Sequence, residues 1–355
     1  MRLTSRVVFQ FFMSLLVATS ILSLKQSRGF LSQVPLTISD SSSQVDEHFR
    51  DDSRNKTLVI ITGTLRGGEK TWNTLYENVL DLNQADLALL LGAKPEKEKN
   101  SSLYQRAKYL WEFPEYSDWT DALNLITNND TKWHVLLRHA FEVEQGTVGG
   151  GFYGGCKGHP GSGAIIFWIR WYLSNIIKEH SLHLKYDRFV LTRSDHYYLC
   201  EHDLSELDPN EVWLPSGEAW WGFTDRHVVA PAHKFLDVLN ILPPVLQNPN
   251  YYLHYRKYNP LVRKHNFVDY PSAVNPEMII KMRWAEDGII PQYFGRTMFT
   301  CGVKGDGTRW RGMSGLRLEE GVYLKYEDEY KEAHHTCFDR NLTKALARHG
   351  GDPIV

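Results

Sequence analysis

The stretch that most constrains the fold is YDRFVLTRSDHYYL, at residues 186–199. Its apolar centre, Phe189 to Leu191, is typical of a strand buried inside a sheet. Arg193, Asp195 and His196 follow directly. Open α/β sheets bind their ligands at the carboxyl ends of central strands. The stretch therefore predicts a central strand that ends at a ligand site, and the alternative is a strand end closed by a surface Arg–Asp pair.

A second strand and turn open the globular part of the chain. The β-branched run at 57–61 leads into Thr62-Gly63-Thr64-Leu65-Arg66-Gly67-Gly68, and a helix-like stretch follows at 70–80. Strand, glycine-rich turn and helix form the first unit of a nucleotide-binding α/β domain, in which glycine allows close approach to a phosphate. The spacing is neither GxGxxG nor a Walker loop, so a plain β–α turn remains the alternative.

Further elements alternate along the chain, as an α/β fold requires. Residues 86–91, 211–215 and 228–230 are predicted strands, and residues 165–177 and 275–284 are predicted helices. The pattern does not assign 104–121 or 133–141. The glycine-rich stretch at 146–164 is predicted to be a substrate-gating loop, since long loops in compact domains are commonly functional.

The N-terminus has the pattern of a targeting segment. An apolar run of 18 residues, 7–24, lies between Arg2 and Arg6 on one side and Lys25 and Arg28 on the other. This length is at the short edge of a bilayer span, so we expect an uncleaved signal anchor at 1–25, with a cleaved signal peptide as the alternative. The preceding positive charges predict a cytoplasmic N-terminus and a lumenal body.

The polar, Ser-rich residues 26–55 are predicted to be a flexible stem, which leaves 56–355 as the folded domain. Four Asn-x-Ser/Thr sequons support a lumenal address in the Golgi or ER: Asn55, Asn100, Asn129 and Asn341. The four cysteines lack zinc-site spacing and permit two disulfides in three pairings, with free thiols as the alternative: Cys156, Cys200, Cys301 and Cys337.

Composition narrows the ligand class. A net charge of −2 without a basic stripe argues against a nucleic-acid partner. Aromatic residues make up 13% of the chain and include eleven Trp, which suits a protein that binds flat, partly polar ligands.

Two later stretches also contain candidate ligand-binding or catalytic residues. The loop at 216–227 is predicted to close over a ligand, because bulky aromatics beside charged groups are costly to bury without partners; a solvated loop is the alternative. Its candidate residues are Trp220, Trp221, Asp225, Arg226 and His227. The predicted helix at 275–284 leads to Glu286 and Asp287, which are either a helix-end charge pair or a general base.

Taken in order, these stretches resemble glycosyltransferases of the GT-A fold. The likeness rests on TLVIITGTLR, YDRFVLTRSD, VWLPSGEAWWGFTDRHVVA and NPEMIIKMRWAEDG, with a late His at 334 or 335. It covers about 56–338 with long unmatched gaps. Within this class the chain resembles uncharacterised glycosyltransferase-like proteins of plants, algae and their large viruses that share a TR-x-D strand.

The resemblance implies a GT-A-like, Rossmann-type mixed sheet flanked by helices. It also implies transfer of a sugar from a nucleotide-sugar to a hydroxyl of a glycan or glycoprotein. Thr62, Gly63, Arg66, Arg193 and Asp195 would then bind the donor. The aromatic and charged residues of the 216–227 loop would hold acceptor or sugar. Asp287, with Glu286 beside it, would remove the acceptor proton if the enzyme inverts.

One departure concerns the metal. Arg193 stands where such enzymes have the first acid of an Asp-x-Asp motif. Either Asp195, with His335 and the diphosphate, holds Mn²⁺ or Mg²⁺, or Arg193 neutralises the diphosphate directly. The departure keeps open a lumenal carbohydrate- or nucleotide-binding protein without activity. A hydrolase using Glu286 and Asp287 is disfavoured, because glycoside hydrolysis needs carboxyls on opposite sides of the bond.

Overall fold

The computed structural model describes residues 56–92, 100–136, 163–217, 219, 222–253, 276–304, 306, 317–319 and 321–348. The chain divides into two units, Met1–Ser43 and Gln44–Val355, and every described residue belongs to the second. The predicted anchor, the predicted stem and the glycine-rich stretch up to residue 162 lie outside the described residues. No helix in the described part of the chain is long and apolar enough to cross a membrane.

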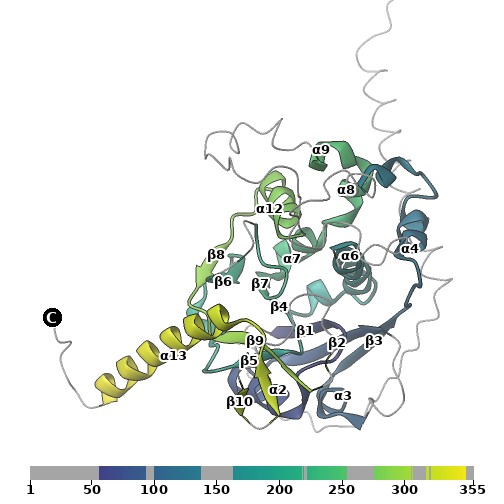
Figure 1. Ribbon diagram of the computed structural model, residues 1–355. Helices are drawn as coiled ribbons and strands as arrows, with labels where there is room; N and C mark the ends of the chain where they lie inside the picture. The colour runs from purple at the N-terminus through teal and green to yellow at the C-terminus, as the bar shows by residue number, and fades with distance from the viewer. Residues whose placement is uncertain are drawn as a thin grey trace, which may run out of the picture. The chain divides into compact units, whose positions relative to one another are not determined.

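Two sheets organise the described residues (Figure 1). The strands of the larger are β1 Thr57–Gly63, β2 Asp86–Gly92, β3 Tyr109–Phe113, β4 Arg188–Thr192, β6 Trp213–Pro215, β7 Val228–Pro231 and β8 Gln292–Phe294. Their order in space is β3-β2-β1-β4-β7-β6-β8. The first four are parallel, whereas β7 runs antiparallel to both β4 and β6. The sheet is therefore mixed.

Helices flank this sheet, and the α/β class predicted from the sequence is confirmed (Figure 1). Before β4 they are α2 Gly68–Leu75, η1 Tyr76–Asp81, α3 Ser102–Arg106, α4 Trp119–Ile126, η3 Lys132–His134, α6 Gly163–Glu179 and η4 Leu182–Leu184. After β4 they are η5 Leu204–Glu206, α7 Ala232–Leu239, α8 Leu242–Gln247, α9 Pro249–Leu253 and α12 Pro276–Glu286.

The central strands are apolar because both of their faces are covered. Val59 and Ile61 of β1 pack with Leu75 of α2 and Val79 of η1 in one core. On the other side, α6 contacts β1 and α7 contacts β4. The helix predicted at 70–80 begins two residues earlier, at Gly68, and continues as the π-helical turn η1.

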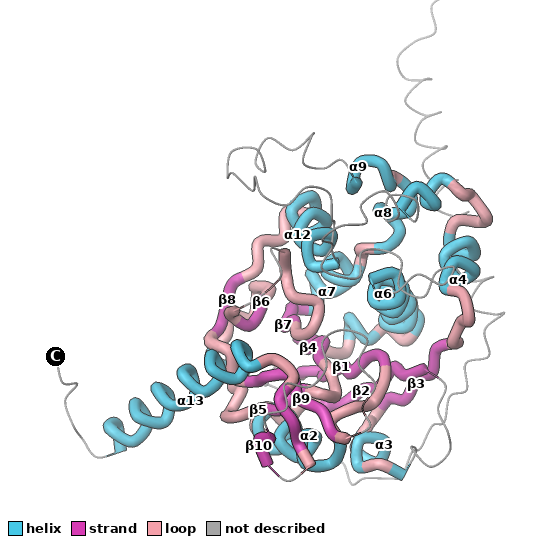
Figure 2. The backbone as a smooth tube through the Cα atoms, in the orientation of Figure 1, coloured by secondary structure: helices cyan, strands magenta, loops and turns pink. Residues whose placement is uncertain are grey.

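The smaller sheet contains β5 His196–Tyr198, β9 Met298–Val303, β10 Arg317–Glu319 and β11 Val322–Leu324. Its strands are antiparallel, in the order β10-β11-β9-β5. Figure 2 shows β5 and β9 of this sheet beside α2. Helix α13, Glu327–Arg348, packs against β9. The stretch at 186–199 is thus two strands in two sheets, joined by a turn that contains Arg193, Ser194 and Asp195.

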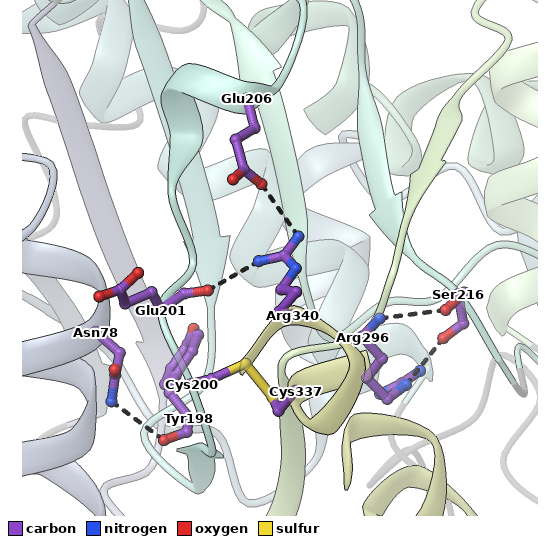
Figure 3. The surroundings of a disulfide bond; sticks show 9 residues. All are labelled: Asn78, Tyr198, Cys200, Glu201, Glu206, Ser216, Arg296, Cys337 and Arg340. Carbon is purple, nitrogen blue, oxygen red and sulfur yellow. Dashed lines mark hydrogen bonds and ion pairs between the residues drawn. A yellow bond between two sulfur atoms is a disulfide. The ribbon is translucent and has the colours of Figure 1, made fainter. Parts of the chain in front are cut away.

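A disulfide ties α13 to the segment after β5 (Figure 3). Cys200 and Cys337 are bonded with Cα atoms 5.8 Å apart. Arg340, one turn further along α13, donates to the Glu201 carbonyl at 3.1 Å and lies 3.2 Å from a Glu206 oxygen. Cys301 is buried and not disulfide-bonded, with its Sγ 3.2 Å from Thr71 Oγ1, and Cys156 lies outside the described residues. The middle of α13 is therefore fixed beside the segment that follows β5.

Candidate functional site

The candidate site lies where the strand order of the main sheet changes direction. From β1 the chain moves outward to β2 and β3, and then returns to β4 on the other side of β1. Ligands of open α/β sheets bind at such a switch point, outside the carboxyl ends of the strands. Ile61 of β1 is in register with Thr192 of β4, so Thr62 and Gly63 lie beside the turn at 193–195. The donor-binding residues predicted from the sequence meet at this edge.

The loop after β1 is tied to the turn after β4. Arg66 N–H donates to Ser194 Oγ at 2.9 Å, and Gly67 N–H donates to Asp306 Oδ2 at 3.0 Å. Gly67 has a φ of +84°, and a Cβ there would lie 3.0 Å from the Ser194 carbonyl oxygen, so the position favours glycine. Two amides at the start of α2 are thus already hydrogen-bonded within the protein.

Asp195 is the centre of the charged turn. It is 2% exposed, and its two oxygens accept from Nε and Nη2 of Arg193, each at 2.6 Å. Arg66 Nη1 lies 3.8 Å from Oδ2. Burial alone would raise the pKa of Asp195, but the charge and hydrogen bonds of Arg193, together with the charge of Arg66, hold it well below its ordinary value. Asp195 is therefore an ionised, fully engaged carboxylate.

Two more cations join this edge from distant parts of the chain. The Arg226 guanidinium lies 4.5 Å from the centroid of the Tyr326 ring, and Lys325 Nζ lies 5.3 Å from the same centroid. Lys325 is only 6% exposed. Burial lowers its pKa to about 8, and the positive charges of Arg193, Arg226 and Arg66 act in the same direction while Asp195 opposes them. The potential around Lys325 is therefore positive.

Glu329 of α13 fixes Arg226 in this position. Its Oε1 accepts from Arg226 Nη1 at 2.6 Å, and its Oε2 accepts from the Thr300 N–H at 2.7 Å. Arg296 Nη1 lies 3.6 Å from the same Oε1. Burial would raise the pKa of Glu329, but Arg226 and Arg296 hold it below its ordinary value. A buried carboxylate shared by two guanidiniums leaves Arg226 little freedom to turn away.

His227, predicted to bind sugar, lies in the core behind β4. It is fully buried, with Nδ1 3.0 Å from Thr192 Oγ1, and its ring packs 5.1 Å from that of His202. His196 Nδ1 lies 3.2 Å from the same hydroxyl. Burial lowers the pKa of His196 to about 4 and that of His202 to about 3, and it holds that of His227 well below its ordinary value. These three buried side chains form a neutral histidine cluster.

The remaining residues of the 216–227 loop are only partly described. Trp220 and Trp221 lie outside the described residues. Asp225 accepts through its backbone carbonyl from Arg170 Nη2 at 3.1 Å, and its Oδ1 lies 3.8 Å from Arg226 Nε. Arg226, predicted to hold acceptor or sugar, instead joins the charged cluster around Asp195.

The predicted acidic pair lies elsewhere. Glu286 and Asp287 both pair with Arg283 of α12, the latter with Oδ2 2.7 Å from Nη2. They precede the amino end of β8, which runs in the same direction as β4 because β6 and β4 are each antiparallel to β7. The pair is therefore at the opposite edge of the sheet from Asp195. The structure does not bring Asp287 to the site where a general base was expected.

The predicted metal ligands are not brought together either. The His335 side chain is 80% exposed on α13, with Nδ1 3.2 Å from Asp339 Oδ2. Within the described ranges, no group of three or more His, Cys, Asp or Glu side chains could hold a metal ion. The arrangement at Asp195 does not fit a divalent ion, because Arg193 already occupies both carboxylate oxygens.

Neither Lys325 nor Glu329 was predicted from the sequence as a site residue. The signal for Lys325 is the clearer one. Lys325 stands between Leu324 and Tyr326, and a lysine within an apolar, aromatic run was the available signal. Lys325 follows β11, and it comes near Asp195 because β11 pairs with β9 and β9 pairs with β5. The sequence did not predict these strand pairings. A comparison of the sequence with protein-family models and with curated proteins finds no match.

Proposed function

We propose that the chain is a glycosyltransferase of GT-A-like fold. It would move a sugar from a nucleotide-sugar to a hydroxyl of a glycan or glycoprotein in the lumen of the secretory pathway. The observation that carries the proposal is the cation cluster, defined as Arg66, Arg193, Arg226 and Lys325, gathered around Asp195 at the switch point of the sheet. Nucleotides bind at this place in α/β sheets, and their phosphates require positive charge.

The chemistry of transfer suits this charge. The acceptor oxygen forms a bond to the anomeric carbon as the bond from that carbon to the diphosphate oxygen breaks. The bonding electrons leave with the diphosphate, whose negative charge grows in the transition state, and the acceptor proton passes to a base. Fixed cations at the leaving group stabilise that charge without reorganising. Arg193 and Arg226 are fixed in this sense, since each is ion-paired to a buried carboxylate.

The disulfide between Cys200 and Cys337 supports the lumenal address, because such bonds persist in oxidising compartments. Asn100 and Asn129 are exposed, as glycan acceptors must be. The membrane anchor remains part of this proposal.

The test is donor turnover by the full chain. Purified protein is incubated with uridine, guanosine and cytidine nucleotide-sugars, with and without glycan acceptors, and the released nucleotide is measured. Release that rises on addition of an acceptor, together with a product heavier by one sugar, is the expected result. Tight binding of a donor with no release under any condition would instead favour a binding protein of the same fold.

A further inference from the structure

We propose that the cation cluster is a diphosphate clamp that takes the place of a divalent metal ion. The clamp would bind the diphosphate of a nucleoside diphosphate directly through side-chain donors. The identity of the ligand as a nucleotide rests on the proposed function, whereas the anion site itself rests on the geometry that follows.

The carboxylate of Asp195 is already fully hydrogen-bonded and is therefore poorly suited to hold a metal ion. A metal-dependent site offers carboxylate oxygens to the ion, but both Asp195 oxygens accept from the Arg193 fork at 2.6 Å. Binding a metal there would break a buried, bidentate pair and leave the Arg193 charge without its partner, which is strongly unfavourable. Asp195 is thus suited to orient Arg193 toward a ligand.

The ammonium of Lys325 is nearly buried among other positive charges. No ion pair of Lys325 is found among the described residues, and its Nζ lies 5.3 Å from the centroid of the Tyr326 ring. The guanidiniums of Arg193, Arg226 and Arg66 act on it electrostatically, and the carboxylate of Asp195 opposes them. A nearly buried ammonium among like charges is destabilising in the free protein. A bound anion would relieve this repulsion.

The backbone amides of the loop after β1 also favour a site built from side chains. In many phosphate sites the donors are backbone amides at a helix N-terminus. Here the amides of Arg66 and Gly67 are bonded to Ser194 and Asp306. These two amides are therefore not available to a phosphate, whereas arginine side chains match phosphate oxygens well. The two loops are held together so that Arg66 and Arg193 approach the same carboxylate.

The experiment is calorimetric titration of the full chain with uridine diphosphate, guanosine diphosphate and inorganic pyrophosphate, in EDTA and in Mn²⁺. We expect binding in EDTA. Lys325→Met should weaken it by about tenfold to a hundredfold, the loss expected for one charge-assisted contact. The same variant should unfold at an equal or higher temperature than the wild type without ligand, because it removes a repelled charge. Lys325→Arg should restore binding.

Lys331→Met is the matched control, since it makes the same exchange at an exposed position of α13, where Lys331 is 71% exposed. It should change neither binding nor unfolding temperature. A Lys325→Met protein that is less stable and binds normally would show that Lys325 is merely structural and would overturn its assignment to the clamp.

The outcomes separate the clamp from the proposed function. Binding that requires Mn²⁺ overturns the clamp and leaves the glycosyltransferase proposal standing. Binding of pyrophosphate in EDTA, with no affinity for uridine diphosphate or guanosine diphosphate in either condition, supports the clamp and counts against that proposal. No binding of any of these anions under either condition overturns both.

Discussion

At the scale of single residues, Asp195 shows how much of its role depends on partners. From the sequence alone, Asp195 is expected at the end of a strand, where either Asp195 holds a metal ion or Arg193 neutralises the diphosphate directly. The structure shows its carboxylate buried and bonded at both oxygens to Arg193, with Arg66 near by. Its charge compensates cations that would otherwise repel one another. It therefore stabilises the fold as well as the site.

We therefore expect Asp195→Ala to lower the free energy of unfolding by about 3 kcal/mol, the effect of removing one partner of a buried ion pair. The loss should appear in urea unfolding monitored by fluorescence. Asp195→Asn, which keeps the shape of the side chain, should lose nearly as much, because the lost interaction is one of charge. Unchanged stability in both variants would mean that Arg193 turns into solvent when Asp195 is absent.

Asp287 gives the opposite expectation. Its carboxylate pairs with Arg283, which also pairs with Glu286, at the far edge of the sheet. Asp287→Asn should leave donor turnover close to that of the wild type and change the unfolding free energy by less than about 1 kcal/mol. Measured kcat and urea unfolding test this together. A large fall in kcat at unchanged stability would return Asp287 to the role of general base.

At the scale of elements, α13 is held by both charge and covalent bonding. Glu329, two residues after its start, fixes Arg226, while Cys337 bonds to Cys200 across 137 residues of sequence. Bonds that close long loops restrict the unfolded chain most. The double variant Cys200→Ala/Cys337→Ala should lower the free energy of unfolding by about 2–4 kcal/mol.

Reduction supplies the control for the disulfide. Dithiothreitol should lower the unfolding temperature of the wild type to that of the double variant and should not affect the double variant itself. Cys301→Ala, which removes a buried thiol outside the disulfide, should keep the sensitivity to dithiothreitol. If dithiothreitol does not change the unfolding temperature of the wild type, even when it is added to the unfolded protein, Cys200 and Cys337 are not bonded in solution.

Sequence patterns predicted the individual strands and helices better than they predicted which strands pair and which side chains come together. The apolar runs that became β1, β2 and β4 were recognisable because burial on both faces demands continuous hydrophobic residues. The helix α6 was recognisable in the same way from its apolar character. The division of 186–199 between two sheets was missed, since the pairing of β5 with β9 depends on residues a hundred positions away. The gathering of Arg226 and Lys325 at Asp195 was missed for the same reason.

At the scale of the whole molecule, stability depends on a cluster that the proposed chemistry does not use. His196, His202 and His227 are buried behind β4, and burial lowers the pKa of each below 6.5. Nε2 of each is buried without a hydrogen-bond partner among the described residues. In the unfolded chain these groups would titrate near 6.5. The folded state therefore keeps them neutral at a pH where the unfolded state protonates them.

The buried histidines make the free energy of unfolding depend on pH. Below about pH 6.5 the unfolded chain binds more protons than the folded one, so stability falls as the pH falls. Each histidine contributes about 1.4 kcal/mol per pH unit, until the pH reaches its folded pKa, about 4 for His196 and about 3 for His202. Urea unfolding between pH 7.5 and 4.5 should show this slope. Replacing His196 by Gln should make it shallower, and replacing the exposed His335 by Gln should not. A stability that is flat from pH 7.5 to 4.5 would mean that these side chains reach water or an anion in the folded protein, and that the packing behind β4 is looser than their burial implies.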